Sequence, residues 1–354
     1  MKQFFRLAIF CTAVVVCAFA ADRGERLRSP WDGQSIALTD AAYNCPQPPE
    51  FAKSITAEGY YTDKNYSIID PAQKKAFDDA TEAPTHLGQM IGLAADSYLT
   101  KGSRAAAQCG YALLNAAAHA GAWSKAMPTN NGTYEQNWLL SGTAMAYLKI
   151  RGSGVGSAED DKAIQKWFGT LAGHVRDYME GHRSNPNSDA WNNHLYWAGL
   201  AVAAAGVACN NKSNFHWGID TYKTGVSEIG PTGVLPREFA RAGMALHYHL
   251  YALSALVMIA ELGEANGIDL YSQDKGAINR LAMLCGEGLL HPEMFSKATG
   301  VTQDLPDKIS GFEIGWAVPY VKRYPDAQLS AWIAEAYTVR FWQWGGLPPG
   351  YAVH

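Results

Sequence analysis

The sequence is short of several features, and each shortage argues against a class of protein. Alternation of apolar and polar residues, which marks a half-buried strand, is nearly absent, so a β-sheet protein is disfavoured. After the N-terminus no segment approaches eighteen uninterrupted apolar residues, as a membrane span requires. There is no His-Glu-x-x-His motif, and His247 and His249 stand two apart, so on a helix they point to different faces. We therefore expect no membrane anchor, no metal and no other cofactor.

Positive charge is scarce as well. The 354 residues contain 29 Lys and Arg against 33 Asp and Glu, a formal net charge of −4. The first 21 residues hold Lys2 and Arg6 and no acid, so the chain without them is more negative by two charges. An acidic surface argues against nucleic acids or anionic membranes as partners. It still permits an anionic substrate if positive charge is gathered in one place.

Residues 1–20 have the composition of a secretory signal peptide. Lys2 and Arg6 precede an uncharged run over 7–19, which ends in a small-residue Ala-Phe-Ala cleavage site. That run is too short for a comfortable membrane span, which disfavours an N-terminal anchor helix. We expect a periplasmic or secreted monomer in which residues 21–354 form one large domain.

Four cysteines remain after the predicted signal peptide, and an oxidising compartment permits disulfides among them. We expect Cys45 to pair with Cys109, which would tie the Pro-rich segment CPQPPE to an early helix. Cys209 and Cys285 lie in apolar runs and are consistent with plain core residues.

From about Pro71 onward, Ala and Leu recur at three- and four-residue spacings, with Gly, Pro or Asn between segments. This pattern predicts an all-α protein. The expected helices cover residues 71–81, 86–101, 103–121, 133–151, 158–182, 188–209, 212–228, 242–266, 275–289, 313–323 and 326–339. Such helices, joined by short turns and without charged heptads, favour a stack of antiparallel helix pairs. An α/α toroid is a stack of this kind, curved until its inner helices surround a cleft.

Aromatic residues are plentiful, with 11 Trp and 18 Tyr, and rings that line a long groove suit a saccharide. For any single ring, a place in the helical core is the simpler explanation. Residues 56–68, TAEGYYTDKNYSI, combine Gly, Tyr and Lys before the first helix, which is typical of an ordered loop that closes over a ligand.

Two polar clusters interrupt the apolar helices. In WNNHLYW, residues 191–197, Asn193 and His194 stand four and three positions before Trp197, so on a helix both flank that ring. In REFARAGMALHYHLYAL, Arg237, Arg241, Tyr248 and Tyr251 follow at steps of four, seven and three. They share one face if the helix continues through Gly243. Taken singly, each has an ordinary structural explanation. Together they are costly to bury for packing alone, so a functional role is favoured.

Asn, His, Arg and Tyr without an obligatory carboxylate suit β-elimination beside a uronic acid. The sugar carboxylate must be neutralised before C5 loses its proton, and amide, imidazole and guanidinium groups can do this. A base then removes the C5 proton and an acid protonates O4. A tyrosine, with an ordinary pKa of about 10, can do both once a cation lowers that pKa. In mannuronate and glucuronate C5–H and O4 share a ring face, so Tyr248 could serve twice.

The segments WNNHLYW, GVLPREFARAGMALHYHLYAL and VMIAELGEANGIDLY resemble the signature segments of polysaccharide lyase family 5, the alginate (mannuronate) lyases. The similarity runs in order from about Cys45 to near the C-terminus. It implies an incomplete α/α toroid, a periplasmic or secreted enzyme, no required metal, and products with a 4,5-unsaturated sugar. It also implies an anionic polysaccharide partner: polymannuronate, with polyglucuronate and hyaluronan as further candidates.

The resemblance assigns roles to individual positions. The carboxylate neutralisers fall on Asn193, His194 and Arg241, and the catalytic tyrosine on Tyr248. Residues expected to contact the sugars, or to belong to the lid and the subsites, are Trp197, His247, Tyr251, Tyr60, Tyr61, Lys64, Arg237 and Arg340.

Two other functions stay open at this point. A toroidal glycoside hydrolase would need two carboxylates flanking the bond, and Asp189 and Glu238 are the acids nearest to the two clusters. A non-catalytic polyuronate-binding protein would use the same cleft without shortening the polymer.

Overall fold

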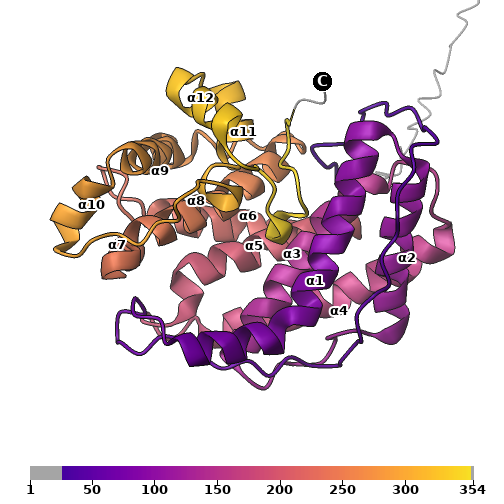
Figure 1. Ribbon diagram of the computed structural model, residues 1–354, viewed down its shortest axis with the longest axis horizontal. Helices are drawn as coiled ribbons and strands as arrows, with labels where there is room; N and C mark the ends of the chain where they lie inside the picture. Colours follow the sequence, from indigo (N-terminus) through magenta and orange to yellow (C-terminus); the bar gives the residue numbers. More distant parts are fainter. Residues whose placement is uncertain (1–25, 352–354) are drawn as a thin grey trace, which may run out of the picture.

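The computed structural model describes residues 26–351, and nearly all of its regular structure is helical (Figure 1). Within this range β-pairing is limited to three isolated bridges, and no strand is present. The predicted all-α class is confirmed. The predicted signal peptide, residues 1–20, lies outside the described residues.

The helices follow in chain order. They are α1 (Pro71–Lys101), α2 (Arg104–Ala120), α3 (Asn130–Ile150), α4 (Ala158–His182), α5 (Asn193–Ala208), α6 (Lys212–Ser227), α7 (Pro236–Phe239), α8 (Ala245–Glu264), α9 (Gln273–Leu290), α10 (Pro292–Thr299), α11 (Ala317–Arg323) and α12 (Ala327–Glu335). Short 3-10 turns are η1 (Asp189–Trp191), η2 (Ala242–Met244), η3 (Gly311–Glu313) and η4 (Trp342–Trp344).

The ends of the long helices carry local signals. Asp70 caps α1 by accepting two backbone N–H groups, Pro71 occupies its first turn, and Gly102 ends it with φ of 64°. At the start of α4, Ser157 and Asp160 form a reciprocal capping box. These signals explain why the predicted and observed ends of the long helices mostly agree.

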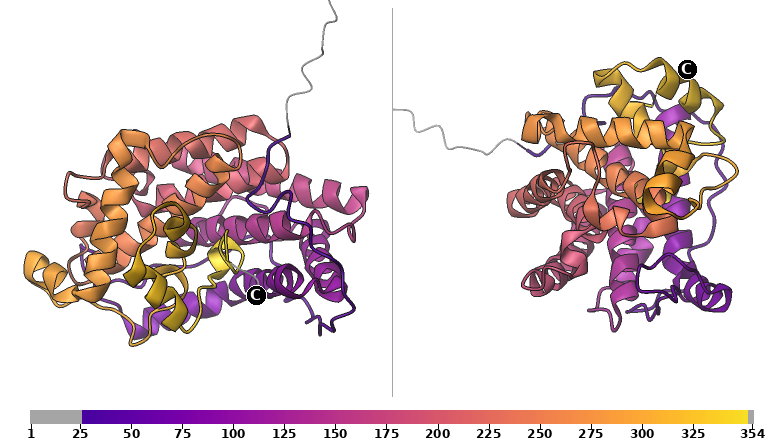
Figure 2. Two further views of the ribbon diagram at one scale, coloured as in Figure 1. Left: turned by 90° about the horizontal axis from the view of Figure 1, so that it is seen from above. Right: turned by 90° about the vertical axis from the view of Figure 1, so that its left-hand side faces the viewer.

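Consecutive helices pack as hairpins, and the hairpins follow the chain across the molecule (Figure 1). Figure 2 shows the same stack from two other sides. Helix α5 lies at its centre, packed against α3, α4, α6 and α8, and nearly all of its residues are buried. Its alanines and glycines allow this close approach of several helices at once.

Proline explains three departures from the predicted helices. Residues 71–101 form one helix rather than two, and Pro84 lies buried inside it. Proline removes one backbone donor and normally bends or ends a helix, but the packing of α1 on α2 and α3 outweighs that cost. The two short helices that were not predicted, α7 and α10, begin at Pro236 and Pro292. Proline is favoured at that first position.

The C-terminal segment fills a groove between α1 and α3. A Cβ atom on Gly142 would lie 2.3 Å from the Trp342 carbonyl oxygen, and one on Gly88 would lie 2.7 Å from the Trp342 ring. Only glycine therefore lets the segment approach this closely. The buried carboxylate of Asp96 secures it, accepting from Arg340 Nε at 3.0 Å and Leu347 N at 2.9 Å.

Asp96 also accepts from Lys149 Nζ at 2.7 Å, and both side chains of this pair are buried. Removing one partner of such a pair would leave an uncompensated charge in the core. The C-terminal segment is thus attached to α1 and α3 by charge as well as by packing.

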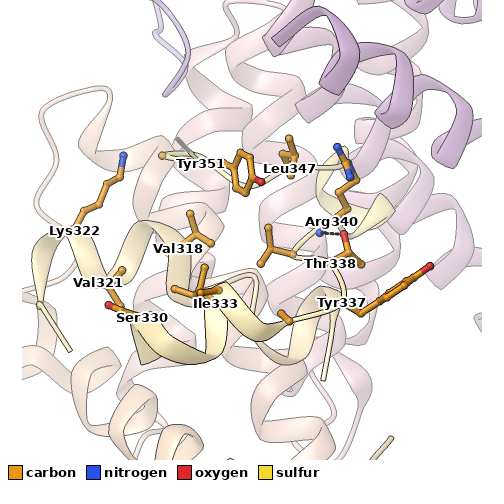
Figure 3. Close-up of a pocket in the computed structure, with 14 residues that line it drawn as sticks. Val318, Val321, Lys322, Ser330, Ile333, Tyr337, Thr338, Arg340, Leu347 and Tyr351 are labelled. Atoms are coloured by element: carbon orange, nitrogen blue, oxygen red, sulfur yellow. Dashed lines mark hydrogen bonds between the residues drawn. The ribbon is translucent and has the colours of Figure 1, made fainter. Parts of the chain in front are cut away.

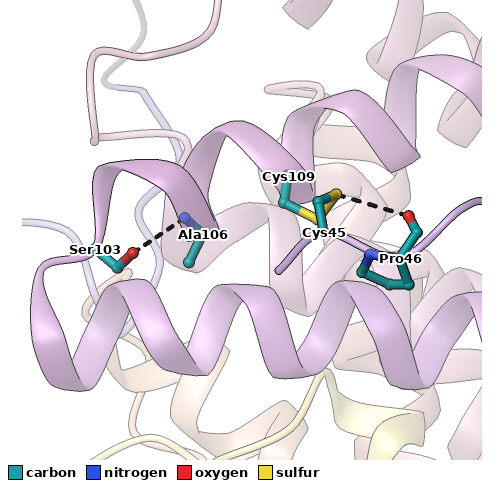
Figure 4. The surroundings of a disulfide bond; sticks show 5 residues. All are labelled: Cys45, Pro46, Ser103, Ala106 and Cys109. Atoms are coloured by element: carbon teal, nitrogen blue, oxygen red, sulfur yellow. Dashed lines mark hydrogen bonds between the residues drawn. A yellow bond between two sulfur atoms is a disulfide. The ribbon is translucent and has the colours of Figure 1, made fainter. Parts of the chain in front are cut away.

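The predicted disulfide between Cys45 and Cys109 is confirmed, and it joins the N-terminal arm to α2 (Figure 4). Cys285 is a buried core residue, and Cys209 is half-buried at the end of α5.

One segment, Ala242–Glu264, is long and apolar enough to cross a membrane by length and composition alone. In the structure 89% of its most apolar window is buried inside the protein. It therefore has the character of a core helix.

The disulfide should contribute measurably to stability. Replacing Cys45 and Cys109 by alanine is expected to lower the free energy of unfolding by about 4 kcal/mol, because the bond closes a loop of 64 residues. Urea denaturation of the double variant measures this, with Cys209→Ala as the control for loss of a thiol. A loss below about 1 kcal/mol would mean that the unfolded chain is not constrained by the bond.

Candidate active site

One large cleft has a volume of about 860 Å³ and takes its walls from elements spread over the whole chain. They are the segment before α1, the helices α1 and α3, the end of α4, the start of α5, the start of α8 and the C-terminal segment. The predicted site residues that line it are Tyr60, Tyr61, His194, Arg241, His247, Tyr248 and Tyr251. The two polar clusters of the sequence therefore meet in one place.

His194 lies on the cleft wall in the first turn of α5. Its imidazole stacks on the Tyr134 ring, with centroids 3.7 Å apart and planes inclined by 18°. Burial lowers the pKa of His194 to about 4, and the nearby Arg241 acts in the same direction, while Asp189 opposes them. The imidazole is therefore neutral at pH 7, and it can donate a hydrogen bond but carries no positive charge.

Asn193 faces away from the cleft, which differs from its predicted place beside His194. Its Nδ2 donates to Glu238 Oε2 at 2.9 Å, and its backbone N donates to Oε1 of the same carboxyl at 2.7 Å. Neighbouring residues on a helix differ in direction by roughly 100°, and here Asn193 points to Glu238 while His194 points into the cleft. Asn192 lines the cleft instead, and its Oδ1 caps α5 by accepting from His194 N.

Trp197 is also misplaced by the prediction. It is fully buried, does not line the cleft, and packs on the Tyr251 ring at a centroid distance of 4.7 Å. Tyr251 itself reaches the cleft wall, and its hydroxyl donates to Gln343 Oε1 at 2.5 Å. Trp197, which the sequence predicts to contact the sugar, thus packs behind Tyr251, which lines the cleft.

Arg241 and Tyr248 form the opposite cluster. The Arg241 guanidinium carbon lies 3.5 Å from the centroid of the Tyr248 ring. Burial raises the pKa of Tyr248 well above its ordinary value, although Arg241 lowers it. Arg241 lowers this pKa as expected, but the loss of water outweighs the cation, so the pKa of Tyr248 stays above its ordinary value in the free protein.

The segment 56–68 covers this cluster, and we refer to it as the lid. The Tyr61 and Tyr248 hydroxyls lie 2.6 Å apart, within hydrogen-bonding distance. Arg241 Nη2 donates to the Tyr66 carbonyl oxygen at 3.0 Å. In this structure the lid is therefore closed onto Arg241 and Tyr248, two of the four residues to which the sequence assigns the chemistry.

Arg237, Arg241, Tyr248 and Tyr251 do not share one helix face, because the helix does not continue. Helix α7 ends at Phe239, and Ala242, the first residue of η2, takes a left-handed φ of 50° before α8. Arg237 does not line the cleft, and its Nη1 donates to the Pro186 carbonyl oxygen at 2.8 Å. A left-handed alanine leaves no clear sign in the sequence, so this break could not be foreseen.

Two further predicted residues lie elsewhere. Lys64 is exposed on the lid and does not line the cleft. Arg340 lines a second hollow of about 500 Å³, formed by α11, α12 and the C-terminal segment (Figure 3). Its Nε donates to Asp96 on α1, so Arg340 is an anchor of the C-terminal segment and does not line the cleft.

The start of α3, NNGTYEQNW, is a part of the cleft wall that was not predicted. Its contributions are Asn130, Asn131, Tyr134, Glu135 and Trp138. WNNHLYW stands out because carboxamides and aromatic rings occur together at the start of an apolar helix. NNGTYEQNW has the same combination, so this pattern could have identified it as part of the site. Glu135 accepts from Thr85 Oγ1 at 2.9 Å, and burial raises its pKa to about 8.

The two acids considered for glycoside hydrolysis do not face one another across the cleft. Asp189 lines the cleft, whereas Glu238 is almost completely buried and does not. The Asp189 carboxylate is occupied by Tyr134, Tyr178 and His182. Asp189 and Glu238 therefore do not form the pair of carboxyl groups flanking the bond that a hydrolase requires. Within residues 26–351, no three His, Cys, Asp or Glu side chains are grouped so that they could hold a metal ion.

Comparisons with known proteins define the class. The family model described as alginate lyase matches residues 54–295. A polysaccharide lyase of Stenotrophomonas maltophilia (strain K279a) is 38% identical over 82% of this chain and 85% of that protein. The alginate lyase of Pseudomonas syringae pv. syringae (strain B728a) is 30% identical over 82% of this chain and 78% of that protein. The protein is therefore a polysaccharide lyase, and the hydrolase and non-catalytic alternatives fall away.

Solved structures agree on the architecture. Alginate lyase A1-III from Sphingomonas species A1 superposes with a TM-score of 0.71 at 21% identity, covering 91% of this chain and 95% of that one. A variant of alginate lyase A1-III complexed with a tetrasaccharide gives a TM-score of 0.75, covering 87% of this chain and 86% of that one. The predicted α/α toroid is thereby confirmed, and the chain belongs to the alginate lyase family.

A pH effect on stability follows from His249, which is buried on α8. Its Nε2 accepts from Leu235 N at 3.0 Å and its Nδ1 donates to the Ala245 carbonyl oxygen at 2.7 Å, so the ring is held neutral. Burial lowers its pKa to about 4. Between pH 6.5 and 4 the unfolded chain therefore binds more protons at this residue, and the stabilisation present at pH 7 is lost as the pH falls.

Buried acids such as Glu135 change stability in the opposite direction with pH, and they are present in both wild type and His249→Gln. The measurement therefore compares these two proteins, so that the contribution of the acids cancels. The difference in unfolding free energy between the two proteins should shrink by about 2 kcal/mol from pH 7 to pH 5. A difference that does not change with pH would show that His249 is not held neutral.

Proposed function

We propose that the protein cleaves 1,4-linked polyuronates by syn β-elimination and leaves a 4,5-unsaturated sugar at the new non-reducing end. The observation that carries this proposal is the meeting of Arg241, Tyr248 and His194 in one cleft. This set can neutralise a sugar carboxylate and exchange a proton, and it includes no pair of opposed carboxyl groups. The names of the related alginate lyases support the substrate class.

In this proposal Arg241 neutralises the C5 carboxylate as a cation, and His194 donates a hydrogen bond to it as a neutral imidazole. Asn192 presents its amide on the same wall as His194. Asn193 acts from behind, because its bonds to Glu238 join the start of α5 to α7. Charge and hydrogen bonds aimed at the developing negative charge lower the barrier to loss of the C5 proton.

Tyr248 supplies the proton chemistry. Its phenolate oxygen takes the proton from C5, the C5–H electron pair forms the C4=C5 double bond, and the C4–O4 bond breaks. The resulting Tyr248 hydroxyl then returns the proton to O4, so no net proton is consumed. Because burial keeps the free hydroxyl protonated, Tyr61 is the neighbouring group through which the first proton can leave. Activity should therefore rise with pH over the alkaline range.

The decisive variant is Tyr248→Phe. It should lower kcat on polymannuronate by at least roughly 100-fold, because one group supplies both the base and the acid. Absorbance of the unsaturated product measures the rate. Tyr222→Phe is the matched control, since it removes a buried hydroxyl that donates to the Leu270 carbonyl oxygen, and neither residue lines the cleft.

Wild type is tested on polymannuronate, polyglucuronate and hyaluronan. No rise in absorbance on any of the three would reject the proposed substrate class. A rise that survives Tyr248→Phe would reject only the role of the tyrosine.

We also propose that the protein acts in the periplasm or outside the cell, on the composition of residues 1–20. Mass spectrometry of the protein from a Gram-negative host should then find an N-terminus at Ala21 in the exported fraction. A chain that keeps residues 1–20 and stays in the cytoplasm would contradict this.

A further inference from the structure

Asp189 gathers hydrogen-bond donors from two helices that border the cleft. It lies on η1, just before α5, and its Oδ2 accepts from the hydroxyls of Tyr134 on α3 and Tyr178 on α4, each at 2.5 Å. Its Oδ1 lies 2.8 Å from His182 Nδ1, also on α4. Three donors directed at one carboxylate hold all of the side chains that carry them.

The imidazole of His194 has much weaker support of its own. Among the described residues no hydrogen bond reaches this ring, and its Nδ1 is buried without a partner. Its closest ring contact is the stack on Tyr134 at 3.7 Å, with Trp138 farther away at 6.4 Å. The orientation of His194 therefore depends on where the Tyr134 ring is held.

We propose that Asp189 is a positioning residue for the lyase reaction: it anchors the Tyr134 hydroxyl, so that the Tyr134 ring fixes the imidazole of His194 toward the substrate carboxylate. This inference rests on the role of His194 in the proposed function. Asp189 touches neither the sugar nor His194 in this account. It acts through Tyr134, whose hydroxyl binds Asp189 and whose ring stacks on His194.

The charge on Asp189 is compatible with an anionic substrate. Burial alone would raise the pKa of Asp189, but the bonds from Tyr134, Tyr178 and His182 lower it on balance, so the carboxylate stays ionised. Those three donors surround the negative charge, and little of the side chain is exposed, 10%. The cleft thus keeps a strong anchor without presenting an open anion to the polymer.

Tyr134 and Tyr178 provide a matched pair of variants. Tyr134→Phe and Tyr178→Phe each remove one hydroxyl bond of 2.5 Å to the same oxygen of Asp189. Only Tyr134 stacks on His194. A purely structural network would lose similar stability and similar activity in both. If Asp189 positions His194 through Tyr134, thermal stability should fall by similar amounts in the two variants, whereas kcat should fall mainly in Tyr134→Phe.

The expected loss of kcat in Tyr134→Phe is about 10- to 100-fold with KM changed less than about threefold, since a small misplacement of a reacting group has effects of this size. Asp189→Asn should show the same split between kcat and KM. Rates are measured by product absorbance on the polyuronan that wild type cleaves fastest.

A second measurement does not depend on substrate. The stack places the ring protons of His194 over the Tyr134 face, so their NMR signals should be shifted upfield, and they are assigned by their loss in His194→Gln. Tyr178→Phe should leave these signals in place, and Tyr134→Phe and Asp189→Asn should move them toward the positions seen in Tyr134→Leu.

The outcomes separate this inference from the proposed function. If wild type cleaves a uronan but Tyr134→Phe matches Tyr178→Phe in kcat and in the His194 signals, Asp189 does not position His194. If wild type cleaves no uronan, the proposed function fails, and the NMR comparison still decides whether Asp189 and Tyr134 hold the imidazole.

Discussion

The buried carboxyl group of Glu238 is the constraint on which the cleft depends. It lies in α7, and both of its oxygens accept bonds from Asn193 at the start of α5. Burying an acid costs free energy unless hydrogen-bond donors satisfy it. Separating the start of α5 from α7 would remove the donors of the Glu238 carboxyl group, so the two segments stay together. One side of this contact leads to His194, and the other leads to Arg241 and then through η2 to Tyr248. The two halves of the site are therefore fixed relative to each other by a residue that never reaches the cleft.

Asp96 and Asp189 repeat the same arrangement in other places. Asp96 connects α1, α3 and the C-terminal segment, while Asp189 connects α3, α4 and the turn before α5. Each acid binds donors from segments that are distant in sequence. These acids thus tie distant segments together, while the guanidinium of Arg241 lines the cleft, where the proposed function needs a positive charge. If the proposed function holds, this division lets a chain with an acidic balance bind an acidic polymer.

The sequence was sufficient for features that depend on periodicity, on local signals or on family likeness. The helices, the disulfide between Cys45 and Cys109, and the toroid belong to this group. The sequence was insufficient where a shift of one residue along a helix decides whether a side chain points into the cleft. Asn192 and Asn193 are chemically identical, and only the register of α5 tells which one faces the cleft. The left-handed backbone at Ala242 likewise depends on tertiary packing, which no residue type announces.

The C-terminal segment has a consequence for the order in which the molecule is made. Phe341, Trp342 and Gln343 form one wall of the cleft, yet they are translated after every helix they contact. A chain is synthesised from its N-terminus, so these three residues are added after helices α1 to α12. A nascent chain folded as far as α12 would still have an empty groove along Gly88 and Gly142 and an incomplete binding surface. Completion of the cleft is therefore among the last steps of biosynthesis.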